Sequence, residues 1–220
     1  ALALLVLRTL KSAGVQLKGD LLVQAVVEDE TTGLGTLAVV EAGYGADGAI
    51  VLDGAYGATA ILAHPGHTTF RITLYGKPAP SCRADLGVNA IEKMFPILER
   101  LRQLEEEMNA NLPDDWSSVV RPISFNPGTI TGGSWTGAVA EKCSLDAQMA
   151  FLPPYTLDSF RQHLVQEILN VAQQDPWFRD NPPQIEFLDL ATEPVELNPD
   201  SEFLKILSGA CEEVFQAPLT

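Results

Sequence analysis

The sequence predicts an α/β protein into which a compact α+β unit is inserted. Two short apolar runs, 21–27 (LLVQAVV) and 49–52 (AIVL), have the composition of strands that are buried on both faces of a parallel sheet. A helical pattern separates them, which is the order of a βαβ arrangement. From residue 67 onward, strands with one polar face alternate with two amphipathic helices, which is typical of an antiparallel sheet covered on one side.

The first part of the chain predicts helices as well as strands. Helical patterns occupy 2–13, 37–42 and 202–215. Gly14 follows the first pattern and suits the left-handed conformation in which many helices end. Together with the two buried strands, these helices predict one α/β domain made of residues 1–65 and 191–220.

Residues 66–190 predict a separate domain. Phe70, Ile72 and Leu74 alternate with polar residues, as expected for a half-buried strand. The elements expected from such patterns are strands around 70–74, 123–125, 143–151 and 185–187, and helices at 91–108 and 157–171. Their order, β-α-β-β-α-β, is that of the ferredoxin-like split βαβ unit, in which two helices cover one face of an antiparallel sheet. Hinges are expected at Pro65–Gly66 and Glu193–Pro194.

The composition excludes some classes of function. The net charge is −15, whereas a nucleic-acid-binding protein needs a basic face to neutralise phosphates. No apolar run approaches the roughly 20 residues that span a bilayer, so no membrane segment is expected. Cys82, Cys143 and Cys211 are widely spaced, which predicts free thiols in a reducing cytoplasm. Cys143 falls on the apolar side of its strand and is expected in the core.

Acidic residues follow both apolar runs at the start of the chain. Glu28, Asp29 and Glu30 come directly after the first run, and Asp53 ends the second. Ligands of open α/β sheets bind beyond the carboxyl ends of the strands, so these carboxylates can converge. Their oxygen atoms suit zinc, magnesium or manganese. A solvated acidic loop is the alternative interpretation, and the spacing alone leaves it open.

Four motifs, in order, resemble a known enzyme family. They are 26–36 (VVEDETTGLGT), 46–53 (ADGAIVLD), the pair 76–79 (GKPA) and 87–91 (GVNAI), and 125–135 (FNPGTITGGSW). The chain is similar to an internal part of the two-zinc hydrolases of the acetylornithine deacetylase and succinyl-diaminopimelate desuccinylase family. The resemblance implies part of a zinc-peptidase-like catalytic domain in 1–65 and 191–220, and a dimerisation domain in 66–190.

The resemblance also implies roles for individual residues. Asp29 occupies the position of the catalytic base, Glu30 that of a ligand to one zinc ion, and Asp53 that of a ligand to the other. Asn126 is expected to bind the substrate. The cofactor would be two zinc ions, with cobalt or manganese as alternatives, and the substrate a small N-acyl amino acid or similar amide. The inserted domain implies a homodimer.

The chain departs from the family pattern at three positions. Asp29 stands where the family usually has glutamate, Pro80 where it has a histidine that stabilises the oxyanion, and Ala150 where it often has arginine. Losing one oxyanion donor typically costs about 100- to 1000-fold in rate. A non-catalytic homologue that dimerises or binds a ligand is therefore the alternative function. An unrelated α/β regulatory domain would require the order of the motifs to be accidental.

Overall fold

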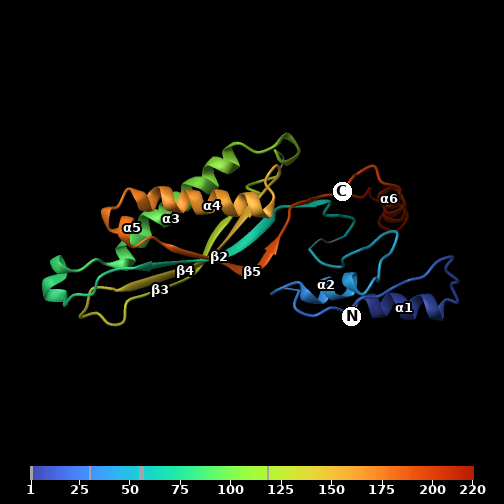
Figure 1. Cartoon of the computed structure of the whole chain (residues 1–220). Coiled ribbons are helices and arrows are strands. Elements are labelled where there is room, and N and C mark those ends of the chain that lie inside the picture. Colours follow the sequence, from blue (N-terminus) through green and yellow to red (C-terminus); the bar gives the residue numbers. More distant parts are fainter. Residues whose placement is uncertain (1, 30, 55–56, 118) are drawn as a thin grey trace. The chain divides into compact units, whose positions relative to one another are not determined.

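The chain forms two compact units in a computed structural model (Figure 1). The structure describes residues 2–29, 31–54, 57–117 and 119–220. The first unit comprises Ala1–Leu62 and Leu197–Thr220, and the second comprises Ala63–Glu196. Because the second unit is continuous in sequence, it interrupts the first.

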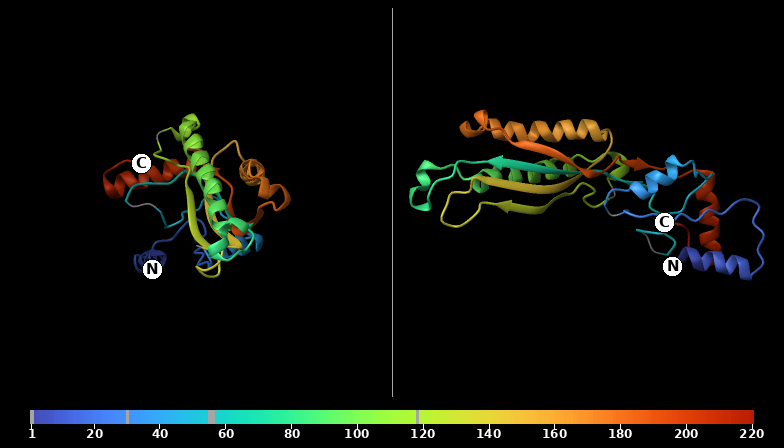
Figure 2. Two further views of the ribbon diagram at one scale, coloured as in Figure 1. Left: turned by 90° about the vertical axis from the view of Figure 1, so that its left-hand side faces the viewer. Right: turned by 60° about the horizontal axis from the view of Figure 1, so that its bottom comes forward.

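The second unit is built on a four-stranded antiparallel sheet with the strand order β3-β4-β2-β5. Its main elements are β2 (Gly66–Tyr75), α3 (Ala90–Ala110), β3 (Phe125–Gly132), β4 (Lys142–Phe151), α4 (Leu157–Gln173) and β5 (Gln184–Thr192). Both long helices lie on the same side of the sheet (Figure 1 and Figure 2). The predicted β-α-β-β-α-β unit is therefore confirmed.

Shorter elements that the periodicity does not predict complete the second unit. They are β1 (Ala63–His64), β6 (Val195–Glu196), α5 (Pro176–Asp180) and the 3-10 turns η1 (Ser81–Leu86) and η2 (Asp114–Trp116). β1 pairs antiparallel with β6, so the two ends of this unit run side by side. A β-carbon at Gly66 would lie 2.5 Å from the Phe151 ring and 2.8 Å from Pro194, so only glycine fits at the first residue of β2.

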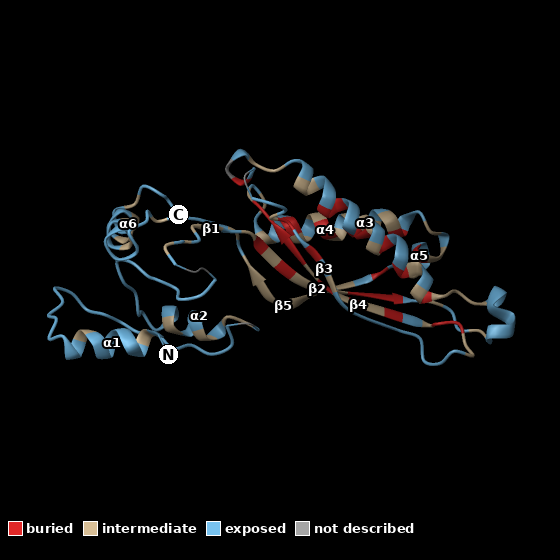
Figure 3. Cartoon of the chain, turned by 180° about the vertical axis from the view of Figure 1, so that it is seen from behind, coloured by how far each residue is buried: buried red, intermediate tan, exposed pale blue. Residues whose placement is uncertain are grey.

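The core of the second unit lies between the sheet and the two helices (Figure 3). Alternate strand residues point into it, and Phe70, Ile72 and Leu74 are fully buried. Each helix adds one apolar face, with the buried residues Met94, Ile97, Leu101, Phe160, Leu164 and Ile168. Burying one such side chain contributes about 1.5–3 kcal/mol. Cys143 belongs to this core, as predicted, and burial raises the pKa of its thiol.

The first unit contains α1 (Leu2–Ser12), α2 (Leu34–Glu41) and α6 (Glu202–Phe215), close to the predicted helices. The prediction of strands at 21–27 and 49–52 is wrong, because both segments are irregular and exposed. A strand needs a neighbour that pairs its backbone N–H and C=O groups, and no described segment of this unit offers one. None of the described residues of this unit is buried, so the apolar runs also have no core to enter (Figure 3).

Two further observations concern the described chain as a whole. Its helices include none that is long and apolar enough to cross a lipid bilayer. The thiols of Cys82, Cys143 and Cys211 are free, and only the first of these residues is exposed.

Candidate functional site

The predicted metal-binding segment lies in the first unit. Asp29 and Asp53 are both exposed, and Glu30 lies outside the described residues. Glu28 has a left-handed backbone, with φ of 60°. Its carbonyl accepts a hydrogen bond from the Thr32 N–H at 3.1 Å, and its carboxylate accepts one from the Thr32 hydroxyl at 2.6 Å. Glu28 therefore holds the turn that precedes α2.

The donor chemistry of this segment fits a divalent cation, because carboxylate oxygens suit zinc and manganese. Within the described ranges, however, no three His, Cys, Asp or Glu side chains come together in a way that could hold a metal ion. Catalytic zinc sites usually have three protein ligands. The described residues therefore do not complete a metal site by themselves. The roles of Asp29, Glu30 and Asp53 stay predictions.

The second unit presents a polar face on the side of the sheet opposite the helices. Paired residues of an antiparallel sheet point to the same side, so the side chains form rows across the strands. The rows are Thr192–His67–Ala150, Thr69–Gln148–Asn126, Glu186–Arg71–Asp146–Thr129 and Gln184–Thr73–Ser144–Thr131. The alternation in the sequence shows that this face is polar. It does not show which polar residues meet, because that depends on the strand order and register.

One ion pair lies in the third row of the polar face. Arg71 donates two hydrogen bonds to the Asp146 carboxylate, each 2.6 Å long. These hydrogen bonds lower the pKa of the Asp146 carboxyl group. The two side chains are 43% and 30% exposed, so the pair contributes at most about 1 kcal/mol to stability. Its main effect is to orient Arg71 and neutralise its charge.

A cavity of about 460 Å³ opens over one end of the polar face. We call it the sheet cavity, and the residues of its lining that matter here are His64, His67, Ser124, Gln148, Ala150 and Thr192. The Thr192 hydroxyl lies 3.0 Å from Nδ1 of His67. Burial, and to a lesser extent the neighbouring His64, lowers the pKa of His67. The His67 ring is therefore uncharged at neutral pH.

Asn126, the predicted substrate-binding residue, lies beside the sheet cavity. It is exposed on β3 and pairs directly with Gln148 of β4, which lines the cavity. The β-carbons of directly paired residues are about 4.5–5.5 Å apart. Asn126 can therefore reach a ligand that projects from the cavity. The motif that contains Asn126 does not single out Gln148, since the two meet only through strand pairing.

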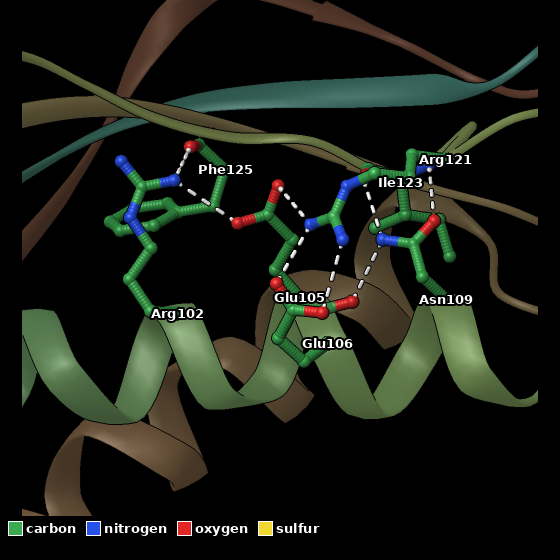
Figure 4. Close-up of polar contacts among 7 residues, drawn as sticks. All are labelled: Arg102, Glu105, Glu106, Asn109, Arg121, Ile123 and Phe125. Carbon is green, nitrogen blue, oxygen red and sulfur yellow. Dashed lines mark hydrogen bonds and ion pairs between the residues drawn. The ribbon is translucent and has the colours of Figure 1, made fainter.

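A polar network on α3 holds the segment that forms one wall of the sheet cavity (Figure 4). The Asn109 side chain donates to the Ile123 carbonyl at 2.7 Å and accepts from the Ile123 N–H at 3.3 Å. Arg102 donates to the Phe125 carbonyl at 2.7 Å. Ser124, which lines the cavity, lies between these two anchored residues. The network therefore fixes the position of Ser124.

Glu105 lies at the centre of this network. It is only 7% exposed, accepts a hydrogen bond from Arg102 at 3.1 Å and lies 3.5 Å from Arg121. Arg121 also donates to both carboxylate oxygens of Glu106, at 3.0 and 2.9 Å. A buried carboxylate needs such partners because an unpaired one is costly. Helical spacing could have indicated the Arg102–Glu105 pair, whereas Arg121 arrives from a loop that carries no periodic pattern.

Pro80 and Ala150, which stand where the family pattern has histidine and arginine, lie in different parts of the second unit. Pro80 precedes η1 and forms an isolated antiparallel bridge with Ala138, and it has neither an N–H nor a side-chain donor. Ala150 lines the sheet cavity and pairs with His67. Its methyl group leaves space there that an arginine side chain would fill.

Residues 62–176 match the family model that is described as the peptidase dimerisation domain. This range contains β2, α3, β3, β4 and α4, and thus most of the second unit. It is just over half of the chain.

Curated relatives extend beyond this range. A chain named N-formyl-4-amino-5-aminomethyl-2-methylpyrimidine deformylase, from Halalkalibacterium halodurans, is 30% identical over 198 residues, which cover 83% of this chain and 44% of the relative. An acetylornithine deacetylase from Vibrio cholerae is 31% identical over 159 residues, which cover 71% of this chain and 40% of the relative. The chain therefore spans less than half the length of these relatives.

Solved structures show the same fold. A tripeptidase from Staphylococcus aureus has a TM-score of 0.67 and 17% identity, over 96% of this chain and 52% of its own. An M20 family metallo-carboxypeptidase from Sulfolobus solfataricus has a TM-score of 0.53 and 11% identity, over 74% of this chain and 47% of its own. The predicted fold class, α/β with an inserted ferredoxin-like domain, is confirmed by these likenesses and by the arrangement of the second unit.

Proposed function

Since this chain belongs to the M20 peptidase family, whose dimerisation domain it contains, we propose that it is part of a zinc-dependent hydrolase of amide bonds in small N-acyl compounds. The match to the dimerisation domain carries this proposal, and the relatives named as a deformylase and a deacetylase support it. Those relatives are more than twice as long as the segment they share with this chain. A longer protein would therefore supply the rest of the catalytic domain, including neighbours for the exposed segments 21–27 and 49–52.

In the longer protein, Asp29 would accept a proton from the attacking water. Glu30 and Asp53 would hold one zinc ion each, with cobalt or manganese as substitutes, and the bound metal would supply an acidified water molecule. Asn126 would contact the substrate. The exposure of Asp29 and Asp53 agrees with ligand-binding roles, and the remaining metal ligands would come from outside this chain.

We propose an N-formyl or N-acyl amine as the substrate, because the two kinds of curated relative are named for removing formyl and acetyl groups. The free thiols support a reducing cytoplasm as the location. The second candidate function is a non-catalytic homologue that only dimerises or binds a ligand. Pro80 favours it, because proline cannot replace the oxyanion donor that the resemblance implies.

The dimer would form along the free edge of β3. β3 is an edge strand, and its end, from Thr129 to Gly132, is exposed. Ile130 is 52% exposed on this edge, and Phe95 of α3 is 58% exposed. Ile91 of α3 lies close to Gly132, so Phe95, one helical turn further on, faces the middle of β3. A second copy that added its own β3 antiparallel would pair the open backbone groups and bury both apolar side chains.

Hydrolysis by the longer protein tests the proposal directly. N-formyl and N-acetyl derivatives of small amines would be supplied with zinc, and release of formate or acetate would be measured. Turnover that a chelator abolishes and zinc restores is the expected result. A folded, dimeric protein without turnover on any of these amides would favour the non-catalytic alternative.

A further inference from the structure

We propose that the sheet cavity binds an uncharged group of the substrate that both donates and accepts hydrogen bonds, such as a carboxamide or an aminopyrimidine edge, and not a carboxylate. This inference rests on the proposed amide hydrolase and specifies which end of the substrate the second unit recognises. The cavity lies wholly within that unit, between the ends of β2, β4 and β5 and the segment before β3. Its volume of about 460 Å³ is within the usual range of small-molecule sites.

The sheet cavity offers both donors and acceptors. Gln148 presents an amide, with two N–H donors and a carbonyl acceptor, and Ser124 presents a hydroxyl. Within the described part of the chain, neither side chain has a hydrogen-bond partner. The Thr192 hydroxyl is hydrogen-bonded to Nδ1 of His67, so Nε2 of this ring is the nitrogen available to a ligand. Three polar side chains from separate segments thus line the cavity with unused hydrogen-bonding capacity.

The described lining of the sheet cavity holds no permanently charged cation, and its basic groups are the rings of His64 and His67. Among the described residues of its lining there is no lysine and no arginine. Arg71 lies on the same face, two rows from His67, but both of its hydrogen bonds go to Asp146. The lowered pKa of His67 keeps that ring neutral. A carboxylate entering the cavity would lose hydration without gaining an opposite charge, which is unfavourable.

Ala150 determines the space in the cavity. It lies in the first row of the polar face, directly opposite His67 of β2. On the other side of β4, the Ala150 N–H donates a hydrogen bond to the Ser124 carbonyl at 2.9 Å. A long side chain here would stand between His67, Ser124 and Gln148. An arginine would both fill the cavity and give it a positive charge. Alanine therefore leaves the cavity open and without the charge that would attract a carboxylate.

The test is a titration of the 220-residue chain with two probes of similar size, 4-amino-2-methylpyrimidine and benzoate. Binding at pH 8 would be followed by NMR, through the backbone amide signals of Ser124, Gln148 and Ala150. We expect the aminopyrimidine to shift these signals saturably and benzoate to leave them unchanged. Gln148→Ala should weaken aminopyrimidine binding about tenfold, because it removes hydrogen bonds to the ligand.

Two more variants complete the experiment. The Ala150→Arg variant should no longer bind the aminopyrimidine and should bind benzoate instead. Ser144→Ala, on the same strand and face but outside the cavity, should bind as the original chain does. The proposal is overturned if benzoate binds the original chain as well as the aminopyrimidine, if neither probe shifts the cavity signals, or if Gln148→Ala has no effect.

Probe binding needs neither metal nor turnover, so the outcome is independent of catalysis. Failure of the aminopyrimidine to bind would remove this inference and leave the hydrolase proposal intact. Aminopyrimidine binding by the chain, combined with a longer protein that hydrolyses no amide, would remove the hydrolase proposal alone.

Discussion

Gln148 of β4 and Asn126 of β3 form a directly opposed pair on the polar face of the sheet. The pair places an exposed amide at the rim of the sheet cavity and a second amide in its lining. Asparagine and glutamine are both able to donate and accept, so the two side chains can hold one ligand group from adjacent strands.

Asn126→Ala should raise the KM of the longer enzyme about tenfold and change kcat little, because one hydrogen bond to the bound substrate is lost. Thr131→Ala is the matched control, since Thr131 is exposed on the same strand and on the same face but lies two rows away. Steady-state kinetics with the preferred amide measure the effect. An unchanged KM would show that Asn126 does not contact the substrate.

Asn109→Ala should lower the free energy of unfolding of the second unit by about 1–3 kcal/mol, because it leaves the Ile123 N–H and C=O without their side-chain partner. Chemical denaturation of the 220-residue chain would measure this loss. Gln103→Ala serves as the control, since Gln103 is exposed on α3 and its replacement should cost less than about 0.5 kcal/mol. Equal losses for both variants would contradict the anchoring role of Asn109.

Acid should destabilise the second unit through His67. Its pKa is lowered in the folded chain, so below the ordinary value of 6.5 the unfolded chain binds the proton first. The contribution of His67 to the unfolding free energy is therefore complete above pH 6.5 and is lost as the pH falls from there through the lowered folded pKa. His67→Gln should flatten the dependence of the unfolding free energy on pH in this window. A slope that His67→Gln leaves unaltered would assign the effect to other groups.

Ile130→Lys should convert the dimer into a monomer, because the new charge would be buried at the proposed β3 edge without a partner. Sedimentation equilibrium of the 220-residue chain would report the mass. Val120→Lys is the control, since Val120 is 89% exposed and lies in the loop before β3. A dimer that survives Ile130→Lys would move the interface to another surface.

Pro80→His in the longer protein should raise the hydrolytic rate about 100-fold or more if Pro80 occupies the lost oxyanion-donor position. The 220-residue chain alone should show no zinc-dependent turnover, because it supplies only Glu30 and Asp53 as predicted ligands. Amidase assays with added zinc measure both. Turnover by the isolated chain would disprove the second statement, and no gain from Pro80→His would show that Pro80 is not that position.

The sequence predicts the second unit well because its strands and helices carry their periodicity locally. The alternation of Phe70, Ile72 and Leu74 determines both a strand and the face that enters the core. Segments 21–27 and 49–52 behave differently, because an apolar run becomes a strand only when other strands pair with it. The sheet cavity was also beyond prediction, since Gln148, His67 and Ser124 meet only through register.

The metal content of the longer protein tests the central claim most directly. Elemental analysis of the purified protein should find two zinc ions per chain, and fewer in the double variant Glu30→Gln with Asp53→Asn, together with loss of amide hydrolysis. A protein that binds no zinc, or one whose zinc content and hydrolysis are the same in the double variant, would contradict the assignment of this chain to a two-zinc amide hydrolase that uses Glu30 and Asp53.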